Sequence, residues 1–515
     1  MHLPRSIPVF VRRCALALAC AALTAPAQAA QPLGHDDIAW LQRASFGVDS
    51  ATLARYQQLG RARYLDDQLA GGDDRLPPAI DAMIRGFEVS STPPVQMLMQ
   101  LRQLRRQYKS APAGAAQDAA KKALQAHLRK IYLQDAQIEL LHAIYGPDQL
   151  KEQMVWFWLN HFSVYAPKGA VRVVAADYID DTIRPHALGK FRDLVMATLE
   201  SPAMLVYLDN ARNVKGKTNE NYARELMELH TLGVGSGYTQ QDVQQLALIL
   251  TGAGIDLRAG MQNGPRRFAR QPRTPLIHNG LFVFRPNQHD FSDKVLLGHT
   301  IKGSGFDEIE QAVTLITRQP ACAHFISQQL AEYFVADQPP PALVDAMAAT
   351  FQRTDGDIAA VLRTLFTSPA LPASYGRKFK DPTQFLVSAM RLAYDGRPIA
   401  NGAPLINWLN QMGEAPFGRI TPDGWPLDSA SWSGSGQMAK RFDVARAIGS
   451  GNNRLFIADG DSAKPHPAPP NLDTPLYRAA IAPYLSSAAR SALDKAASPM
   501  EWNTFLLSSP DFNYR

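Results

Sequence analysis

The residues best suited to chemistry lie between Asn219 and Gly233, where ionisable and amide side chains are densest in an otherwise apolar neighbourhood. The apolar spacing predicts a helix over this stretch, with a short polar cap at its start and Gly233 at its end. Glu225 and Glu228 then lie one turn apart, and His230 follows them. Two carboxylates and an imidazole in this arrangement suit a metal site or an acid–base pair.

A structural role is the alternative for the same residues. Arg224 can pair with Glu220 one turn before it and with Glu228 one turn after it, which would make these charges an ion-pair network. Structural networks perturb carboxylates just as functional sites do. If the stretch holds a cofactor or ligand instead, the amides of Asn219 and Asn221 and the guanidinium of Arg224 are candidates to bind it, together with the more distant Lys294.

A second polar pair lies in a helix predicted over 148–162, which is apolar nearly all round and is therefore expected to be buried. Its last turn carries Asn160 and His161. A buried polar group is costly unless it has a partner, so both side chains must be hydrogen-bonded. His161 is either a core histidine that donates to a carbonyl or a general base or metal ligand that faces the central helix.

Three further polar residues follow a predicted strand at Leu281–Phe284. We call His289, Asp290 and Lys294 the second cluster. They are either part of a functional site or a simple turn in which Asp290 bonds the backbone. Asp209 begins a loop that resembles an EF-hand in length but lacks its ligands and its glycine. If these groups meet the first cluster, Asp209, Glu225, Glu228, His289 and Asp290 are the candidate metal ligands. Carboxylate and imidazole sets suit Mn, Fe, Zn or Ca, depending on geometry.

The first 29 residues read as a secretory signal peptide. A basic start precedes a short apolar run, and Ala27-Gln28-Ala29 matches a cleavage site. Cleavage near Ala29 would remove three arginines and lower the formal charge from +6 to +3, so the high isoelectric point is no argument for nucleic acid. It would also leave Cys322 as the only cysteine, without an intramolecular disulfide. We expect a periplasmic or secreted protein without a transmembrane segment.

The rest of the chain predicts a mainly α fold: one large helical unit over residues 30–515 with a few short strands or hairpins. A run of helices is expected over 306–371, and Thr239 with Asp242 predicts a capping box at a helix start. Two lobes, about 30–257 and 276–515, could meet at a basic loop over Arg258–Pro275. The stretches 98–108 and 118–132 predict a helical hairpin with a basic outer face, for which binding of phosphates is the functional alternative to solvation. The tryptophans of the loop 417–432 either anchor the core or line a binding site. No H-E-x-x-H, nucleophile elbow or Walker A sequence is present.

Several spaced motifs occur in the order of one known family. They are Trp158–Phe162, His186–Gly189, Pro202–Asp209, Asn219–Gly233, Tyr238–Val243, Thr251-Gly252, His289–Lys294 and Gly424-Trp425. In these residues the chain, from about Asp36 to its C-terminus, resembles the bacterial "domain of unknown function 1800" (DUF1800) family. The resemblance implies an exported, largely helical protein, often encoded beside an exported family related to sulfatases, and it implies no established activity. Leu159 and Ala253 depart from the family, which often has histidine and tryptophan at these positions.

Two functional hypotheses remain open at this point. The first is an enzyme in which Glu225 or Glu228 is a base or metal ligand, and His161 or His230 is a ligand or proton shuttle. It would use a divalent metal ion as cofactor. The second is a non-catalytic envelope scaffold or partner of a co-exported enzyme, in which the same polar groups only lock the fold.

Overall fold

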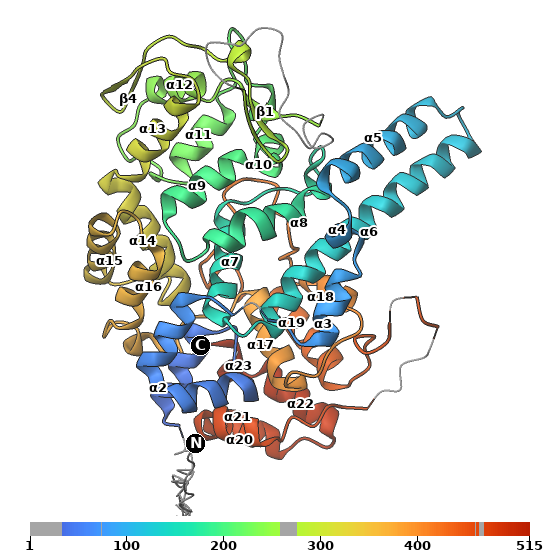
Figure 1. Cartoon of the computed structure of the whole chain (residues 1–515). Coiled ribbons are helices and arrows are strands. Elements are labelled where there is room, and N and C mark those ends of the chain that lie inside the picture. Colours follow the sequence, from blue (N-terminus) through green and yellow to red (C-terminus); the bar gives the residue numbers. More distant parts are fainter. Residues whose placement is uncertain (1–32, 74, 258–275, 459, 463–467) are drawn as a thin grey trace, which may run out of the picture. The chain divides into compact units, whose positions relative to one another are not determined.

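A computed structural model describes residues 33–515, apart from 74, 258–275, 459 and 463–467 (Figure 1). The predicted signal peptide and the basic loop Arg258–Pro275 therefore lie outside the described residues. Residues 33–515 form one unit that shares a continuous hydrophobic core. The described part is mainly helical with a few short antiparallel strands, as predicted.

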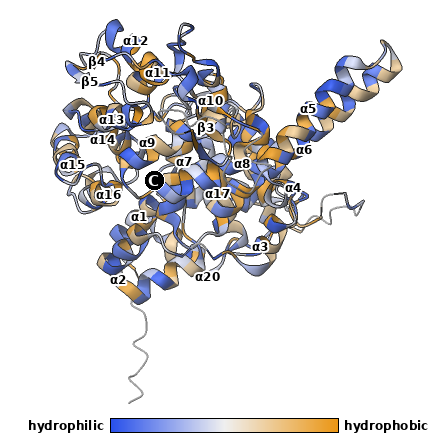
Figure 2. Cartoon of the chain, turned by 45° about the horizontal axis from the view of Figure 1, so that its top comes forward, coloured by the Kyte–Doolittle hydropathy of each residue, from blue (hydrophilic) through white to orange (hydrophobic). Residues whose placement is uncertain are grey.

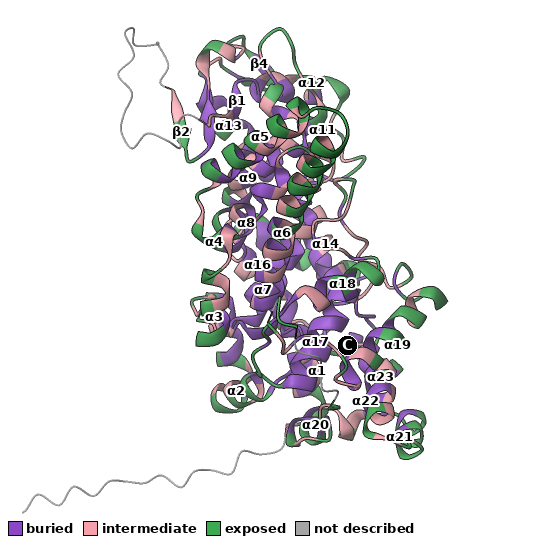
Figure 3. Ribbon diagram, turned by 90° about the vertical axis from the view of Figure 1, so that its right-hand side faces the viewer, coloured by how far each residue is buried: buried purple, intermediate pink, exposed green. Residues whose placement is uncertain are grey.

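Helix α7 (Gln149–His161) runs through the middle of this core. Every side chain from Gln149 to Trp158 is buried, because the apolar second half packs in the core and polar side chains of the first half, such as Gln149 and Gln153, find hydrogen-bond partners. Helix α17 (Pro382–Tyr394) is buried along its whole length, and Figure 3 shows both helices mostly in the colour of buried residues. Two such helices need cover on all sides, which the remaining elements provide.

Further helices come from the N-terminal half of the chain. They are α1 (His35–Ala44), α2 (Ser50–Ala70), α3 (Pro78–Arg85), α4 (Glu88–Ser91), α8 (Ala175–Asp177), α9 (Phe191–Glu200), α10 (Pro202–Tyr207), α11 (Asn221–Glu228) and α12 (Gln240–Ile249). Of these, α2 packs directly on α7. A π-helical turn over Tyr178–Ile183 joins α8 to the segment before α9. The capping box predicted at Thr239 and Asp242 is present at the start of α12.

The predicted hairpin consists of α5 (Pro94–Ser110) and α6 (Ala115–Tyr145). Only the C-terminal part of α6 is buried, and it packs on α17 and α18. Figures 1 and 2 show that the end of α5 and the start of α6 project from the rest of the unit.

The strands form two small antiparallel sheets. In the first, β3 (Phe282–Phe284) lies between β1 (Ala253–Ile255) and β2 (Ile277–Asn279), with Ala253 and Ile277 both opposite Phe284. In the second, β4 (Lys294–Leu296) pairs with β5 (His299–Ile301). The sequence predicted β3 because its residues are strongly apolar. It did not predict its partners, which are short and contain glycine or polar residues.

The C-terminal half returns to helices. They are α13 (Phe306–Thr317), α14 (Pro320–Phe334), α15 (Pro341–Arg353), α16 (Ile358–Phe366), α18 (Ala403–Gln411), α19 (Ser435–Gly449), α20 (Pro475–Ala480), α21 (Ser487–Asp494), α22 (Pro499–Ser508) and α23 (Pro510–Asn513). Helices α13 to α16 match the predicted run. Helix α19 was not predicted, because glycines and polar residues at its start hide its apolar stripe.

Helix α11 is shorter than the predicted helix over 219–233. Its first turn is delayed because the side-chain oxygen of Asn219 accepts from the backbone N–H of Asn221, which holds the chain in a turn. After Glu228 the chain continues as turns and ends at Gly233, whose φ is +85°. Arg224 pairs with Glu220 at 3.2 Å as predicted. Its second partner is the side chain of Gln240 rather than Glu228.

Candidate functional site

A cleft of about 190 Å³ opens at the end of α7. Its lining comes from four parts of the chain: the last two turns of α7, the end of α11 with the residues that follow it, one face of α14, and the loop that precedes α19. The lining residues are Phe157, Asn160, His161, Glu228, Leu229, Val234, Phe325, Gln329, Asp423, Trp425 and Leu427. The cleft therefore joins His161 and Glu228, two residues singled out in the sequence, to a loop about 200 positions further on.

His161 presents a defined tautomer to the cleft. Its Nε2 lies 3.0 Å from the carbonyl oxygen of His230, and because a carbonyl only accepts, Nε2 carries the hydrogen. Burial lowers the pKa of His161 to about 4, although the bond to this carbonyl acts in the opposite direction. The ring is therefore neutral at neutral pH, and its Nδ1 keeps a free lone pair, the form required of a base or of a metal ligand.

The His230 side chain plays a different part. It is fully buried, and the pKa of its imidazole lies well below the usual value, first because of burial and then because of His161. Its ring packs 5.1 Å from the ring of Phe162, and neither ring nitrogen has a hydrogen-bond partner within the described residues. His230 does not line the cleft, and its direct contribution is the backbone carbonyl that orients His161.

Glu228 and Asp423 line the cleft, and Glu225 lies close enough to both to be affected by their charges. Burial raises the pKa of Glu225, and the charges of Glu228 and Asp423 raise it further. Burial also acts on Asp423, but hydrogen bonds from Arg419 and Thr421 outweigh it and lower the pKa of this carboxyl. The sequence singled out the two glutamates and missed Asp423, because nothing in a Pro/Gly-rich loop indicates which helix it will cover.

Asn160 fixes this loop to α7. Its Nδ2 donates to the backbone oxygen of Trp425 at 2.9 Å, and its Oδ1 accepts from the backbone N–H of the same residue at 2.6 Å. Gly424 makes the approach possible, since its φ is +74° and a Cβ there would lie 2.3 Å from the Asn160 carbonyl oxygen. The predicted need of Asn160 for partners is met by this pair of bonds. Of the two loop tryptophans, Trp425 lines the cleft, whereas Trp432 is buried.

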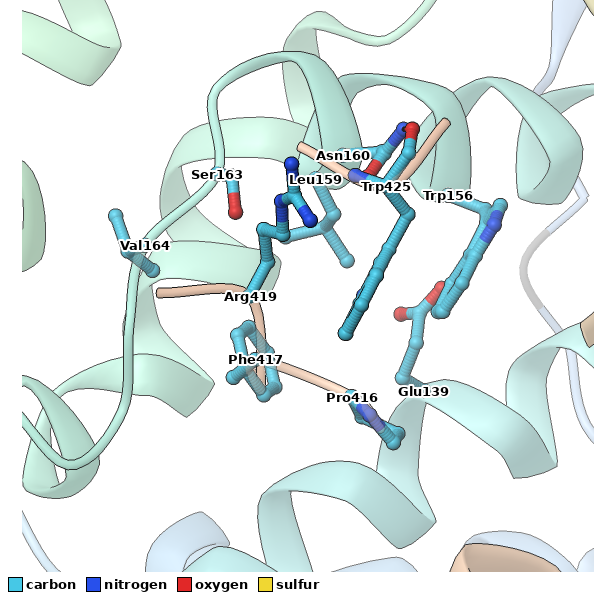
Figure 4. A pocket seen from close by; sticks show the side chains of 10 residues that line it. All are labelled: Glu139, Trp156, Leu159, Asn160, Ser163, Val164, Pro416, Phe417, Arg419 and Trp425. Atoms are coloured by element: carbon cyan, nitrogen blue, oxygen red, sulfur yellow. Dashed lines mark hydrogen bonds between the residues drawn. The ribbon is translucent and has the colours of Figure 1, made fainter. Parts of the chain in front are cut away.

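Asn160 and Trp425 also line a second pocket, separate from the cleft, which we call the slot (Figure 4). Trp156, Trp425 and Glu139 are among the residues that line it. Leu159, where the family resemblance favours histidine, contributes an apolar wall.

Glu139 is the unusual group of this slot. It is 1% exposed, and its Oε1 has no hydrogen-bond partner within the described residues. Burial raises its pKa to about 8, opposed by the charge of Arg184, which lies 3.1 Å from Oε2 and binds Glu152 more closely. The sequence did not single out Glu139, because a lone glutamate in a long helix is ordinarily solvated.

The second predicted cluster forms a separate site. His289 Nε2 lies 2.8 Å from Glu308 Oε1, and Lys294 Nζ lies 2.6 Å from Glu308 Oε2, with all three side chains fully buried. Asp290 accepts from the backbone N–H of Ser292, as the turn interpretation predicted. Hydrogen bonds from His289 and Lys294 outweigh burial and lower the pKa of Glu308. This triad ties α13 to β4 and to the loop that precedes it.

The remaining predicted residues stabilise the loop that leads to α11. Asp209 pairs with Lys168 at 2.8 Å, and its backbone oxygen accepts from the side chain of Asn219. Asn221 donates to the backbone oxygen of Leu208. These bonds are made to the chain itself, so the amides predicted to hold a cofactor are already occupied.

No group of three or more His, Cys, Asp or Glu residues is arranged to hold a metal ion in the part of the chain that the structure describes. The predicted ligands Asp209, Glu225, Glu228, His289 and Asp290 are distributed over the cleft, the α11 loop and the buried triad. The residues present thus do not fit the expected divalent metal centre. No helix among the described residues is both long enough and apolar enough to cross a bilayer.

Fold and cleft together define a largely helical protein in which loops close a polar cleft at the end of a buried helix. The chain belongs to the family described as "Protein of unknown function (DUF1800)", whose model matches residues 39–514. The resemblance in the sequence motifs is thereby confirmed. Comparison with curated proteins and with solved structures finds no match.

Proposed function

We propose that this protein is an exported enzyme that uses the cleft at the end of α7 for general acid–base chemistry, with His161 as the proton acceptor. The observation that carries the proposal is the neutral imidazole whose Nε2–H is engaged by the His230 carbonyl. A base needs a lone pair at a fixed place beside bound substrate, and this bond leaves Nδ1 as that lone pair. The proposal assigns no step to a metal ion.

The carboxylates supply the second half of the chemistry. Glu228 lines the cleft, and Glu225, three residues earlier on α11, has a raised pKa. A carboxyl that holds its proton more tightly than usual is suited to return a proton to a leaving group. We therefore assign Glu225 and Glu228 to proton donation and substrate binding, and His161 to proton removal from water or a substrate hydroxyl.

The charge of the cleft also favours a class of substrate. Glu225, Glu228 and Asp423 are acidic, and the neighbouring cations are already paired, Arg419 with Asp423 at 2.6 Å and Arg224 with Glu220 at 3.2 Å. Aromatic faces from Phe157, Phe325 and Trp425 line the same cleft. Carboxylates and aromatic faces together attract cations, so the preferred substrate carries an amine or another cationic group next to an apolar part.

Activity is tested on purified mature protein with chromogenic esters, amides, phosphates, sulfates and glycosides, including members that carry an amine. We expect turnover of at least one substrate by the wild type and a loss of about 100-fold or more in His161→Asn. His324→Asn is the matched control, because His324 is exposed on α14 beside the cleft. Equal activity in both variants contradicts the assignment of His161.

The alternative has its own signature. If no substrate of any class is turned over, and His161→Asn only lowers stability, the polar groups lock the fold and the protein is a non-catalytic partner. A co-exported protein related to sulfatases is then the first candidate to test by pull-down from the envelope fraction. Export itself is tested by N-terminal sequencing of the protein from cell fractions. We expect the mature chain to begin after Ala29 and to lie in the periplasm or medium.

A further inference from the structure

The part of the α5–α6 hairpin that precedes residue 131 carries the net positive charge of the chain. Residues 94–130 contain eight lysines and arginines and a single acidic residue, Asp118. Their net charge of +7 exceeds the +6 of the whole chain, so all other residues together are slightly acidic. A charge imbalance of this size confined to one element is an electrostatic feature of the surface rather than of the fold.

The cations of α5 are arranged as a stripe. Arg102, Arg105, Arg106 and Lys109 follow the three-or-four spacing that places side chains on one face of a helix. On α6, Lys122 and Arg129 lie seven residues apart and so share a face. All of these except Arg105 are exposed, whereas Arg105 is half-buried.

Most of these cations have no counter-ion in the protein. Lys130 pairs with Glu88 at 2.8 Å, and Arg105 donates to the backbone oxygen of Gly169. No ion pair joins any of the other six to a carboxylate within the described residues. They are Arg102, Arg106, Lys109, Lys121, Lys122 and Arg129. These six cations lie on two helices that project from the rest of the unit (Figures 1 and 2). They repel one another, and binding of an external anion would reduce this repulsion.

The shape of the surface selects the kind of anion. Helix α5 has 17 residues and is therefore about 25 Å long, and its cations are spread along that length rather than gathered around one point. Such a row suits a field of many anionic groups better than a single phosphate. Among the large apolar residues exposed on the described surface, Met99 alone belongs to this hairpin, so contact would be electrostatic and would not require insertion.

We propose that the α5–α6 hairpin docks this protein on the surface of a bilayer rich in anionic phospholipid. The acidic remainder of the chain is then directed away from the lipid, which gives the docked protein one preferred orientation. Docking of this kind is peripheral and reversible by salt, because the attraction falls off within a Debye length. The proposal is independent of the catalytic assignment of the cleft.

Co-sedimentation of the mature protein with phospholipid vesicles tests the proposal. The two probes are vesicles of phosphatidylcholine alone and vesicles in which about one-third is phosphatidylglycerol. The hairpin variant replaces Arg102, Arg106, Lys109 and Lys122 with Gln. The matched control replaces Arg63, Arg377, Lys440 and Lys495, exposed cations on other elements, with Gln and so has the same net charge.

We expect binding of the wild type and of the control to the anionic vesicles only, at about 0.1 M salt, and release at about 1 M salt. Each cation that faces the bilayer contributes about five-fold to partitioning. The hairpin variant, with two or more such cations neutralised, therefore binds at least about 25-fold more weakly. Equal weakening in both variants, or no binding of the wild type to anionic vesicles, overturns the proposal. Unchanged circular dichroism shows that the variant is folded.

Discussion

The substitution Asn160→Ala tests how the cleft is held together. Asn160 makes two hydrogen bonds to the backbone of Trp425, at 2.9 Å and 2.6 Å, and these connect the end of α7 to a loop some 265 residues later. Alanine removes both bonds and leaves α7 otherwise unchanged. Helix and loop remain joined by packing, so we expect the loop to open locally while the core stays folded.

The magnitude follows from the two bonds. A hydrogen bond between neutral groups contributes about 0.5–1.5 kcal/mol net, so the pair contributes about 2 kcal/mol. Since each 1.4 kcal/mol is a factor of ten, the opened state becomes about 30-fold more populated. The backbone N–H of Trp425 loses its acceptor in the variant and is exposed to exchange whenever the loop opens.

Amide hydrogen exchange at Trp425 is therefore the assay. We expect exchange about 30-fold faster in Asn160→Ala and unchanged exchange in the buried turns of α17. Asn452→Ala is the control, because Asn452 is exposed and lies outside the loop, after the end of α19. If exchange at Trp425 is unchanged, or if α17 accelerates equally, the two bonds do not hold the cleft and the reasoning is refuted.

Three further substitutions address other parts of the structure. Glu308→Ala leaves the buried ammonium of Lys294 without its carboxylate partner. It should lower the free energy of unfolding, measured by chemical denaturation, by about 3–5 kcal/mol. The control Glu310→Ala, on an exposed face of the same helix, should change it by less than about 0.5 kcal/mol. Because Glu139 has a raised pKa in the folded protein, its contribution to stability is full below the unfolded pKa and is lost as pH rises through about 8. Glu139→Gln should therefore flatten the fall in melting temperature between about pH 5 and pH 8, and an identical pH profile would contradict the raised pKa. Gly424→Ala places a Cβ 2.3 Å from the Asn160 carbonyl oxygen at a φ of +74°, so we expect a loss of at least about 1–3 kcal/mol and a reduced signal from Trp425 in near-ultraviolet circular dichroism.

Local patterns predicted much of the fold. The apolar periodicity of α13 to α16, the capping box of α12 and the apolar character of α7 and β3 are properties of short stretches, and the structure has each of them. Short-range chemistry also explains where α11 departs from the prediction, since the turn at Asn219 delays the first helical residue. Such features depend on neighbours in sequence, which a reader of the sequence can see.

The composition of the cleft depends on contacts that sequence patterns do not encode. Asp423 and Trp425 reach α7 from a loop more than 250 residues later. Glu308, the partner that makes His289 and Lys294 a closed triad, lies in a helix whose own pattern is ordinary. The sequence therefore suggested that both polar clusters meet at one metal centre, because it did not reveal that Glu308 is the partner of His289 and Lys294.

The tautomer and charge of His161 are the central claim, and a long-range ¹H–¹⁵N correlation spectrum of the imidazole rings measures both. A titration of the mature protein labelled at histidine, with His161→Asn to assign the signal, reports the pKa and the protonated nitrogen. We predict a neutral ring with the hydrogen on Nε2 and a pKa of about 4. A ring protonated on Nδ1, or a pKa near the ordinary histidine value of about 6.5, would contradict the account.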